Sequence, residues 1–426
     1  MTPRLSGQIS AYRPRVADQE LTRRLAATGA VLIEGARACG KTQTALQPAG
    51  SAVRLDSDRP AREAALLDPS LLLEGEKPRV IDEWQLVPDI WNQVRVWVND
   101  HPDQPGAFIL TGSAQPEDDV MRNVGALRFS RLRMRPMSLH ESGHSTSAVS
   151  LRALFAGDAA RATAPSFDIR TLVERIAFGG WPVLMDRTVD AAQLALRGYL
   201  DDTARVDLQR IGAAARDPEN VARVLRSLAR HTATEGSARS LAADIGGEDG
   251  PIKSETVLEY LGALARVFVV EDQPAWSPSL RSRSILRNAP KRHFVDPSLA
   301  AAALRATPAR MLQDPEMLGQ LFESLVVRDL RIYSAPLDGT VHHYRDNTGL
   351  EVDAIVALGD GRWAAFQVKL GQQEIDDAAS TLLRFVQRID TKRHGPPGFL
   401  SVITGWGYAY QRPDGVNVIP IATLAP

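Results

Sequence analysis

Short apolar runs and amphipathic stretches alternate over the N-terminal part of the chain. The apolar runs at residues 31–33, 80–81 and 107–110 are each followed by glycine, hydroxyl or acidic residues. Runs of this length are typical of buried parallel strands, and the stretches between them have helical spacing. The alternation predicts a doubly wound α/β domain with a parallel sheet over residues 15–142.

The patterning changes after this domain. Residues 143–150 contain repeated Ser and His without periodicity and are predicted to form a linker. Residues 151–218 are rich in Ala, Leu and Arg and are predicted to be helical. We expect a winged-helix-like region at residues 219–296 and a second α/β domain at residues 297–426, which makes the fold class multi-domain α/β.

The turn after the first apolar run has the spacing of a phosphate-binding loop. It fits G-x-x-x-x-G-K-[ST] without insertion, and a helix can begin where the loop ends. Glycines let the backbone curl around a phosphate, the lysine can pair with the β- and γ-phosphates, and the threonine hydroxyl can ligate Mg²⁺. The alternative is a chance glycine loop between a strand and a helix. The predicted nucleotide-binding residues are Gly35, Ala36, Arg37, Ala38, Cys39, Gly40, Lys41 and Thr42, and the predicted cofactors are ATP and Mg²⁺.

Acidic and hydroxyl residues follow the next two apolar runs. Asp82 ends the second run and can hold the Mg²⁺ shell, while its neighbour Glu83 can polarise the attacking water as a general base. Ser113 follows the third run, and its hydroxyl can sense the γ-phosphate or align the water. The alternatives are an acidic turn and a capped turn without chemistry.

The composition of the chain limits its possible partners and its cellular compartment. The 426 residues are 44% hydrophobic and 24% charged with a net charge of −1, so no global field attracts nucleic acid. The single cysteine excludes a disulfide framework and fits a reducing cytoplasm. No apolar run reaches the roughly 18 residues of a membrane span, and no charged-then-apolar leader is recognisable. We therefore expect a cytoplasmic protein without a membrane partner.

A helix-turn-helix pattern lies in the third region. Residues 240–246 and 253–261 have the spacing of its two helices, and residues 266–270 can follow as a wing strand. A basic patch that can contact DNA phosphates comes next. It consists of Arg281, Arg283, Arg287, Lys291 and Arg292. A protein-interaction module is an equal alternative, because the second helix carries Glu255 and Glu259.

Four residues near the C-terminus have the layout of a second site. Glu323 lies on an amphipathic helical stretch, Asp353 on one apolar run, and Gln367 and Lys369 on the next. An acid on a helix, an acid on a strand, and an acid or amide plus lysine on the following strand is the layout of the restriction-endonuclease superfamily. The first three could share a divalent ion with the Val368 carbonyl, and the lysine could orient a water. Because an amide binds Mg²⁺ less firmly than a carboxylate does, an inert copy of that fold is the alternative to a DNA nuclease.

The order of these motifs resembles the prokaryotic AAA-type ATP-binding proteins that join a P-loop domain to a C-terminal domain of unknown function. The similarity extends nearly from end to end. Its landmarks are Tyr12-Arg13-Pro14-Arg15, the phosphate loop, Val80-Ile81-Asp82-Glu83-Trp84-Gln85, Leu110-Thr111-Gly112-Ser113, Pro136-Met137-Ser138-Leu139-His140-Glu141, Gly179-Gly180-Trp181-Pro182, Lys291-Arg292-His293-Phe294-Val295-Asp296 and the pair formed by Glu351-Val352-Asp353 and Gln367-Val368-Lys369.

The resemblance implies one further catalytic residue and a choice of functions. In similar proteins a Gly-Arg pair precedes the Pro-x-Ser-x-x-Glu stretch, and Leu127-Arg128 stands there in this chain. Arg128 would then meet the γ-phosphate, in cis or from a neighbouring subunit of a homo-oligomer. We expect a Mg²⁺-dependent ATPase, with two alternatives: a nucleotide-gated DNA- or protein-binding regulator with little turnover, and a DNA nuclease licensed by the ATPase.

Overall fold

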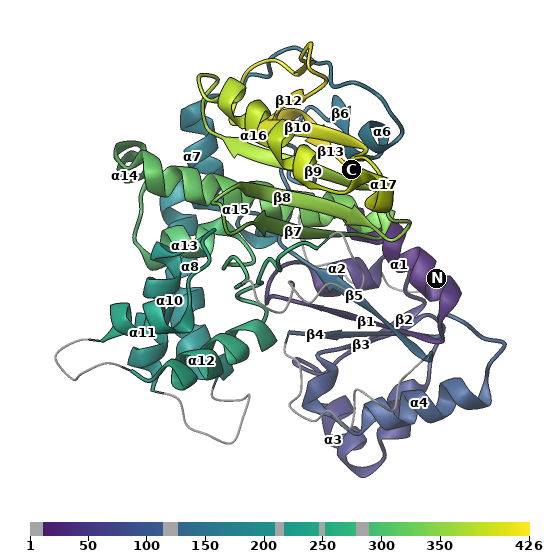
Figure 1. Ribbon diagram of the computed structural model, residues 1–426. Helices are drawn as coiled ribbons and strands as arrows, with labels where there is room; N and C mark the ends of the chain where they lie inside the picture. The colour runs from purple at the N-terminus through teal and green to yellow at the C-terminus, as the bar shows by residue number, and fades with distance from the viewer. Residues whose placement is uncertain (1–11, 114–126, 209–216, 247–251, 278–288) are drawn as a thin grey trace.

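The computed structural model describes residues 12–113, 127–208, 217–246, 252–277 and 289–426. Figure 1 shows two sheets stacked above one another and a group of helices beside them. The sheet near the N-terminus is wholly parallel, as the sequence predicts, and the sheet near the C-terminus is mixed. The predicted α/β class, with a parallel sheet near the N-terminus and a second sheet near the C-terminus, is therefore confirmed.

The N-terminal sheet has five strands in the order β2-β3-β4-β1-β5. Its strands are β1 (Ala30–Gly35), β2 (Ser51–Arg54), β3 (Arg79–Asp82), β4 (Phe108–Gly112) and β5 (Phe129–Met134), and its helices are α1 (Val16–Ala27), α2 (Lys41–Leu46), α3 (Arg59–Leu67) and α4 (Ile90–Asp100). Because all strands are parallel, the ends of β1, β3 and β4 meet at one edge. The residues that follow these strands are therefore brought together.

Alternate residues of β1 face two different cores. Val31 and Ile33 belong to a large core that includes α2 and the helices between residues 151 and 334. Ala30 and Leu32 face a separate core with α3 and α4, where Trp91 stacks on Phe129 at 4.0 Å. Burial of both faces explains why the strands are continuously apolar rather than alternating. In Figure 1, α1 and α2 lie between the two sheets and α3 and α4 lie on the far side.

The helices beside the sheets come from the middle of the chain. They are α7 (Ile169–Phe178), α8 (Val189–Asp202) with its π-helical continuation η4 (Thr203–Asp207), α10 (Pro218–Arg230), α11 (Ala238–Ile245), α12 (Ser254–Arg266), α13 (Pro297–Ala303) and α14 (Pro308–Gln313). The two predicted helices of the helix-turn-helix correspond to α11 and α12. Bridges at Val270 and Gln273 pair this segment with Phe294 and Lys291. The winged-helix interpretation of the region stays a prediction.

The C-terminal sheet has six strands in the order β11-β12-β10-β9-β8-β7. The elements of this part are α15 (Pro315–Ser334), β7 (Gly339–Arg345), β8 (Glu351–Leu358), β9 (Trp363–Lys369), α16 (Ile375–Arg388), α17 (Thr391–His394), β10 (Phe399–Thr404), β11 (Tyr410–Gln411), β12 (Asn417–Pro420) and β13 (Leu424–Ala425). Strands β7, β8 and β9 form an antiparallel meander, and β10 joins it in parallel. Helices α15 and α16 pack on this sheet.

Residues 143–150, which the sequence predicts to be a linker, pack against the C-terminal part of the chain. Strand β6 (Val149–Ser150) pairs in parallel with β13, and the Ser150 hydroxyl donates to the Pro426 carbonyl at 2.6 Å. Helix α6 (Leu151–Phe155) follows, and the Phe155 ring meets Phe399 of β10 at 5.0 Å. Residues 143–155 therefore pack against the C-terminal part of the chain and do not form a free linker. The predicted domain boundaries stay predictions.

Buried charges join the N-terminal domain to the C-terminal part. The Arg328 guanidinium of α15 bridges Asp296 and Asp329 at 2.7 Å each, and all three side chains are buried. Asp329 also accepts the Leu139 amide, while Asp296 accepts the Gly180 amide. Because each carboxylate has several donors, burying it does not leave an unpaired charge. Three of the landmark motifs therefore meet at this network, through Leu139, Gly180 and Asp296.

Candidate nucleotide-binding site

The phosphate loop connects β1 to α2, as its spacing predicts. A Cβ added at Gly35 would lie 2.2 Å from the Met134 carbonyl oxygen, so only glycine fits there. Gly40 has φ 109°, a left-handed conformation that also favours glycine, and Ala38 between them has φ 59°. Positive φ angles along such a loop turn successive amides toward one side and create a concave anion-binding surface. Cys39 is fully buried, as a small packing residue would be.

Lys41 and Thr42 begin α2 beneath this loop. The Lys41 ammonium donates to the carbonyls of Gly35 and Ala36 at 2.9 Å each, and the side chain is buried. The Thr42 hydroxyl donates to Asp82 Oδ1 at 2.8 Å. The lysine ammonium is therefore held against the loop, and the threonine oxygen lies next to a carboxylate. Such a pair of oxygens is suited to hold Mg²⁺.

Asp82 is the last residue of β3, which pairs directly with β4. The Asp82 side chain is almost fully buried. Its Oδ1 accepts hydrogen bonds from the hydroxyls of both Thr42 and Thr111. On its other side, Oδ2 lies 3.6 Å from Nε of Arg54 on β2. These contacts fix the orientation of the carboxylate at the strand edge. Thr111 lies in the predicted hydroxyl-bearing turn. The sequence predicts a role at the γ-phosphate for Ser113 in this turn and not for Thr111.

Glu83 follows Asp82 in a left-handed conformation, with φ 56° and ψ 47°. Its amide donates to the Thr111 hydroxyl at 3.4 Å, and its carboxylate accepts hydrogen bonds from Ser113, at 3.1 Å, and from Gln85. A left-handed glutamate is uncommon and strained, and it turns the side chain toward the end of β4. Both Glu83 and Ser113 therefore reach the edge that carries the phosphate loop.

Arg128 lies at the opposite edge of the sheet. It precedes the first residue of β5, its carbonyl accepts the Ala30 amide at the start of β1, and its guanidinium donates to Asn99 at the end of α4. The six residues of β5 separate it from the phosphate loop by roughly 20 Å. The cis role predicted for Arg128 is therefore wrong, because the side chain cannot span that distance. A role toward a neighbouring subunit stays a prediction.

Arg15 is a component of the site that the sequence does not single out. Its guanidinium donates to the Cys39 carbonyl at 2.8 Å, the Arg135 carbonyl at 2.8 Å and Glu141 Oε1 at 3.0 Å. Burial would raise the pKa of Glu141, but Arg15 and the amides of Ser138 and Val16 lower it below its usual range. The landmarks that contain Arg15 and Glu141 thus form one buried clamp behind the phosphate loop. The arginines of the first landmark and the single glutamate of the other are the signal that could have indicated the clamp.

We expect Arg15→Met to destabilise the protein by about 3–5 kcal/mol, because it leaves Glu141 buried without its ion-pair partner. The measurement is the midpoint of chemical denaturation, together with ATP affinity. Arg13→Met is the matched control, since Arg13 is exposed and donates to the Ser142 carbonyl at 3.2 Å. Equal midpoints for the two variants would contradict the clamp.

Arg37 links the phosphate loop to the helices beside the sheet. One guanidinium nitrogen, Nη1, donates to both carboxylate oxygens of Asp207 at 3.1 Å. Asp207 ends the π-helical segment η4 that continues α8. π-helical turns often occur at functional sites. A movement of the phosphate loop would therefore displace or break the Arg37–Asp207 ion pair at the end of η4.

The predicted C-terminal site brings Glu323 and Asp353 together, but around a lysine of the same chain. The Lys291 ammonium lies 2.7 Å from Glu323 Oε1, 2.7 Å from Glu351 Oε1 and 3.7 Å from Asp353 Oδ1. Burial disfavours the charged ammonium, yet the three carboxylates raise the pKa of Lys291 above its usual range. In the described part of the chain, no three or more His, Cys, Asp or Glu side chains are grouped to hold a metal ion.

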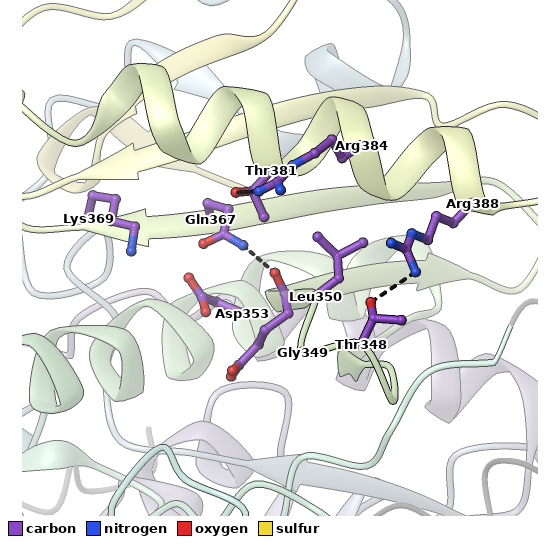
Figure 2. A pocket seen from close by; sticks show the side chains of 10 residues that line it. Thr348, Gly349, Leu350, Asp353, Gln367, Lys369, Thr381, Arg384 and Arg388 are labelled. Atoms are coloured by element: carbon purple, nitrogen blue, oxygen red, sulfur yellow. Dashed lines mark hydrogen bonds between the residues drawn. The ribbon is translucent and has the colours of Figure 1, made fainter.

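Gln367 and Lys369 lie beside this cluster on β9. The Gln367 amide nitrogen donates to the Glu351 carbonyl at 2.7 Å, and the Val368 amide donates to Asp353 Oδ2 at 2.8 Å. Both side chains line a pocket of about 500 Å³ together with Asp353 and with Arg384 and Arg388 of α16. Figure 2 shows how these side chains lie. The predicted residues are thus neighbours. The Val368 group that points at Asp353 is its amide and not the predicted carbonyl ligand.

The basic patch is corrected at Lys291, one of the two members that the structure describes. Lys291 is 2% exposed, so it cannot contact DNA phosphates. Arg292 donates to Asp272. Arg281, Arg283 and Arg287 lie outside the described residues.

The N-terminal domain is similar to P-loop domains of the AAA type. Residues 27–143 match the family model described as an AAA domain, and they contain the whole parallel sheet with its phosphate loop. Residues 169–310 and 318–424 match two models described as domains of unknown function, DUF8612 and DUF4143.

The chain is also similar to whole proteins. Uncharacterized proteins of Mycobacterium bovis and Mycobacterium tuberculosis are each 26% identical over 372 residues, which cover 86% of this chain and 76% of theirs. A solved structure, the Walker-type ATPase PABY2304 of Pyrococcus abyssi, is 12% identical with a TM-score of 0.44, over 67% of this chain and 94% of that one. Among the described helices, none is long and apolar enough to cross a bilayer.

Proposed function

We propose that the protein is a Mg²⁺-dependent ATPase whose site lies at the carboxyl edge of the N-terminal sheet. The observation that carries the proposal is the convergence of Lys41, Thr42 and Asp82 on the phosphate loop, with Glu83 one residue further. The concave loop fits the β-phosphate, and the lysine exchanges its two carbonyl partners for phosphate oxygens. The AAA-domain match over residues 27–143 supports the same proposal.

The cation would be held by Thr42 and Asp82. Their oxygens are 2.8 Å apart, and Asp82 is kept in place from both sides by Thr111 and Arg54. Held by these two residues, Mg²⁺ would neutralise the negative charge that develops on the phosphates during hydrolysis. The threonine must release its hydrogen bond to Asp82 and present its oxygen to the ion.

Glu83 accepts a proton from the attacking water in this proposal. Its carboxylate is oriented by Ser113 and Gln85, and its backbone by Thr111. A carboxylate held at the edge of the sheet can align water against the γ-phosphate. Ser113 lies at the end of the neighbouring strand, where its hydroxyl can report whether the γ-phosphate is present.

The experiment that tests the proposal is phosphate release from ATP by the full chain. We expect turnover with Mg²⁺ and none with EDTA. No Mg²⁺-dependent turnover under any condition would refute the ATPase. Adding duplex DNA in a parallel reaction separates a DNA-stimulated enzyme from one that acts alone, and a winged-helix-like region that binds DNA would give salt-dependent binding.

A second candidate is a nucleotide-gated regulator, and the Arg37–Asp207 pair favours it. Nucleotide binding repositions loop side chains, so the pair can couple the loop to η4 and the helices beyond it. We expect Arg37→Ala and Asp207→Asn to change ATP affinity non-additively, with a coupling of up to about 1 kcal/mol because Arg37 is half exposed. A double-mutant cycle by calorimetric titration measures this coupling. Strict additivity would leave the pair without a role in gating.

A further inference from the structure

The C-terminal acid cluster contains a cation that the protein itself supplies. Lys291 enters it from the segment before α13, far from the three acids in sequence. Two carboxylate oxygens, from Glu323 and Glu351, lie at hydrogen-bond distance from its nitrogen, and Asp353 lies slightly further away. The lysine side chain is 3% exposed, so the charge is hidden from water. Each acid comes from a different position on α15 or β8.

We propose that Lys291 takes the place of a divalent ion in this cluster, so that the wild-type C-terminal domain binds no metal there and cannot use one to cut DNA. A divalent ion needs carboxylate oxygens at about 2.0–2.6 Å. The ammonium already lies 2.7 Å from the same oxygens, and two positive charges in one buried site would repel each other strongly. Metal and lysine are therefore mutually exclusive occupants.

The backbone around Lys291 holds it in the cluster. Its amide donates to the Gln273 carbonyl at 3.0 Å, and the Gln273 amide donates back to its carbonyl at 2.9 Å. The Gln273 side chain in turn donates to the carbonyls of His342 and Asp353 at 2.9 and 3.0 Å. This pairing fixes the Lys291 backbone beside β7 and β8, so its side chain enters the cluster from a defined position.

The first test counts bound metal in the folded wild-type protein. Mn²⁺ binding is measured by equilibrium dialysis without nucleotide, in wild type and in Asp353→Asn. We expect the same number of Mn²⁺ ions in both proteins, because Lys291 keeps the cluster closed. One ion fewer in Asp353→Asn would overturn the proposal. This comparison does not depend on ATP hydrolysis and needs no variant of Lys291.

The second test opens the cluster with Lys291→Met. Three carboxylates without a cation should take up one additional Mn²⁺ per chain, and Mn²⁺ should raise the melting temperature by roughly 5 °C. Adding Asp353→Asn to this variant should remove the extra ion. Lys369→Met is the matched control, because Lys369 lines the same pocket as Glu351 and Asp353, whereas the ion pairs of these acids are with Lys291, and it should gain none. A folded Lys291→Met that gains no ion would contradict the proposal.

Discussion

Replacing Glu83 with glutamine is expected to lower ATP turnover by about 10²–10⁴-fold while leaving ATP binding nearly unchanged. The amide keeps the size of the side chain and can still meet Ser113, but it cannot accept the proton of the attacking water. Binding should persist because the phosphate loop and Lys41 are untouched. Phosphate release and calorimetric titration on the same preparation measure the two quantities.

Gln85→Ala is the matched control for this variant. It removes a hydrogen bond to the Glu83 carboxylate without removing the carboxylate itself, so turnover should fall far less than in Glu83→Gln. Turnover in Glu83→Gln equal to wild type would show that another residue accepts the proton.

Replacing Lys41 with alanine is expected to weaken ATP binding roughly 10- to 100-fold or more. The change removes the ammonium beneath the loop, and each charged hydrogen bond lost costs about 1.5–3 kcal/mol. No other residue between Gly35 and Thr42 can supply this charge, since the Arg37 side chain pairs with Asp207. Calorimetric titration with ATP and Mg²⁺ measures the effect.

Lys369→Ala removes the same kind of charge from the C-terminal pocket and serves as the control. Its ATP affinity should equal that of wild type, because the pocket is built by β8, β9 and α16. If Lys41→Ala also bound ATP like wild type, the loop would not be the nucleotide site.

The N-terminal sheet and the phosphate loop follow from the sequence because their determinants are local. A continuous apolar strand, two glycines at fixed spacing and a Lys-Thr pair define the loop within a dozen residues. Parallel pairing then brings Asp82 and Glu83 to the same edge. The prediction of a cis role for Arg128 is wrong because it depends on spacing from a motif along the chain and not on the direction of β5. Its position at the start of β5 puts it at the wrong edge.

The C-terminal cluster and the 143–150 segment were less predictable because their partners are remote in sequence. In the sequence, Lys291 is one more cation in a basic stretch. Its pairing with Gln273 in the folded chain directs the side chain into the acid cluster. Residues 143–150 lack periodicity, yet they are ordered by the last strand of the chain, more than two hundred positions later. Arg15 likewise meets Glu141 only after the sheet has formed.

The nucleotide recovered from the protein after incubation with ATP and Mg²⁺ tests the central claim most directly. Three proteins are incubated, separated from free nucleotide, denatured and analysed by chromatography. We predict ADP from wild type, intact ATP from Glu83→Gln, and little nucleotide from Lys41→Ala. Intact ATP from the wild-type protein, or the same nucleotide in the same amount from all three proteins, would contradict an ATPase at this site.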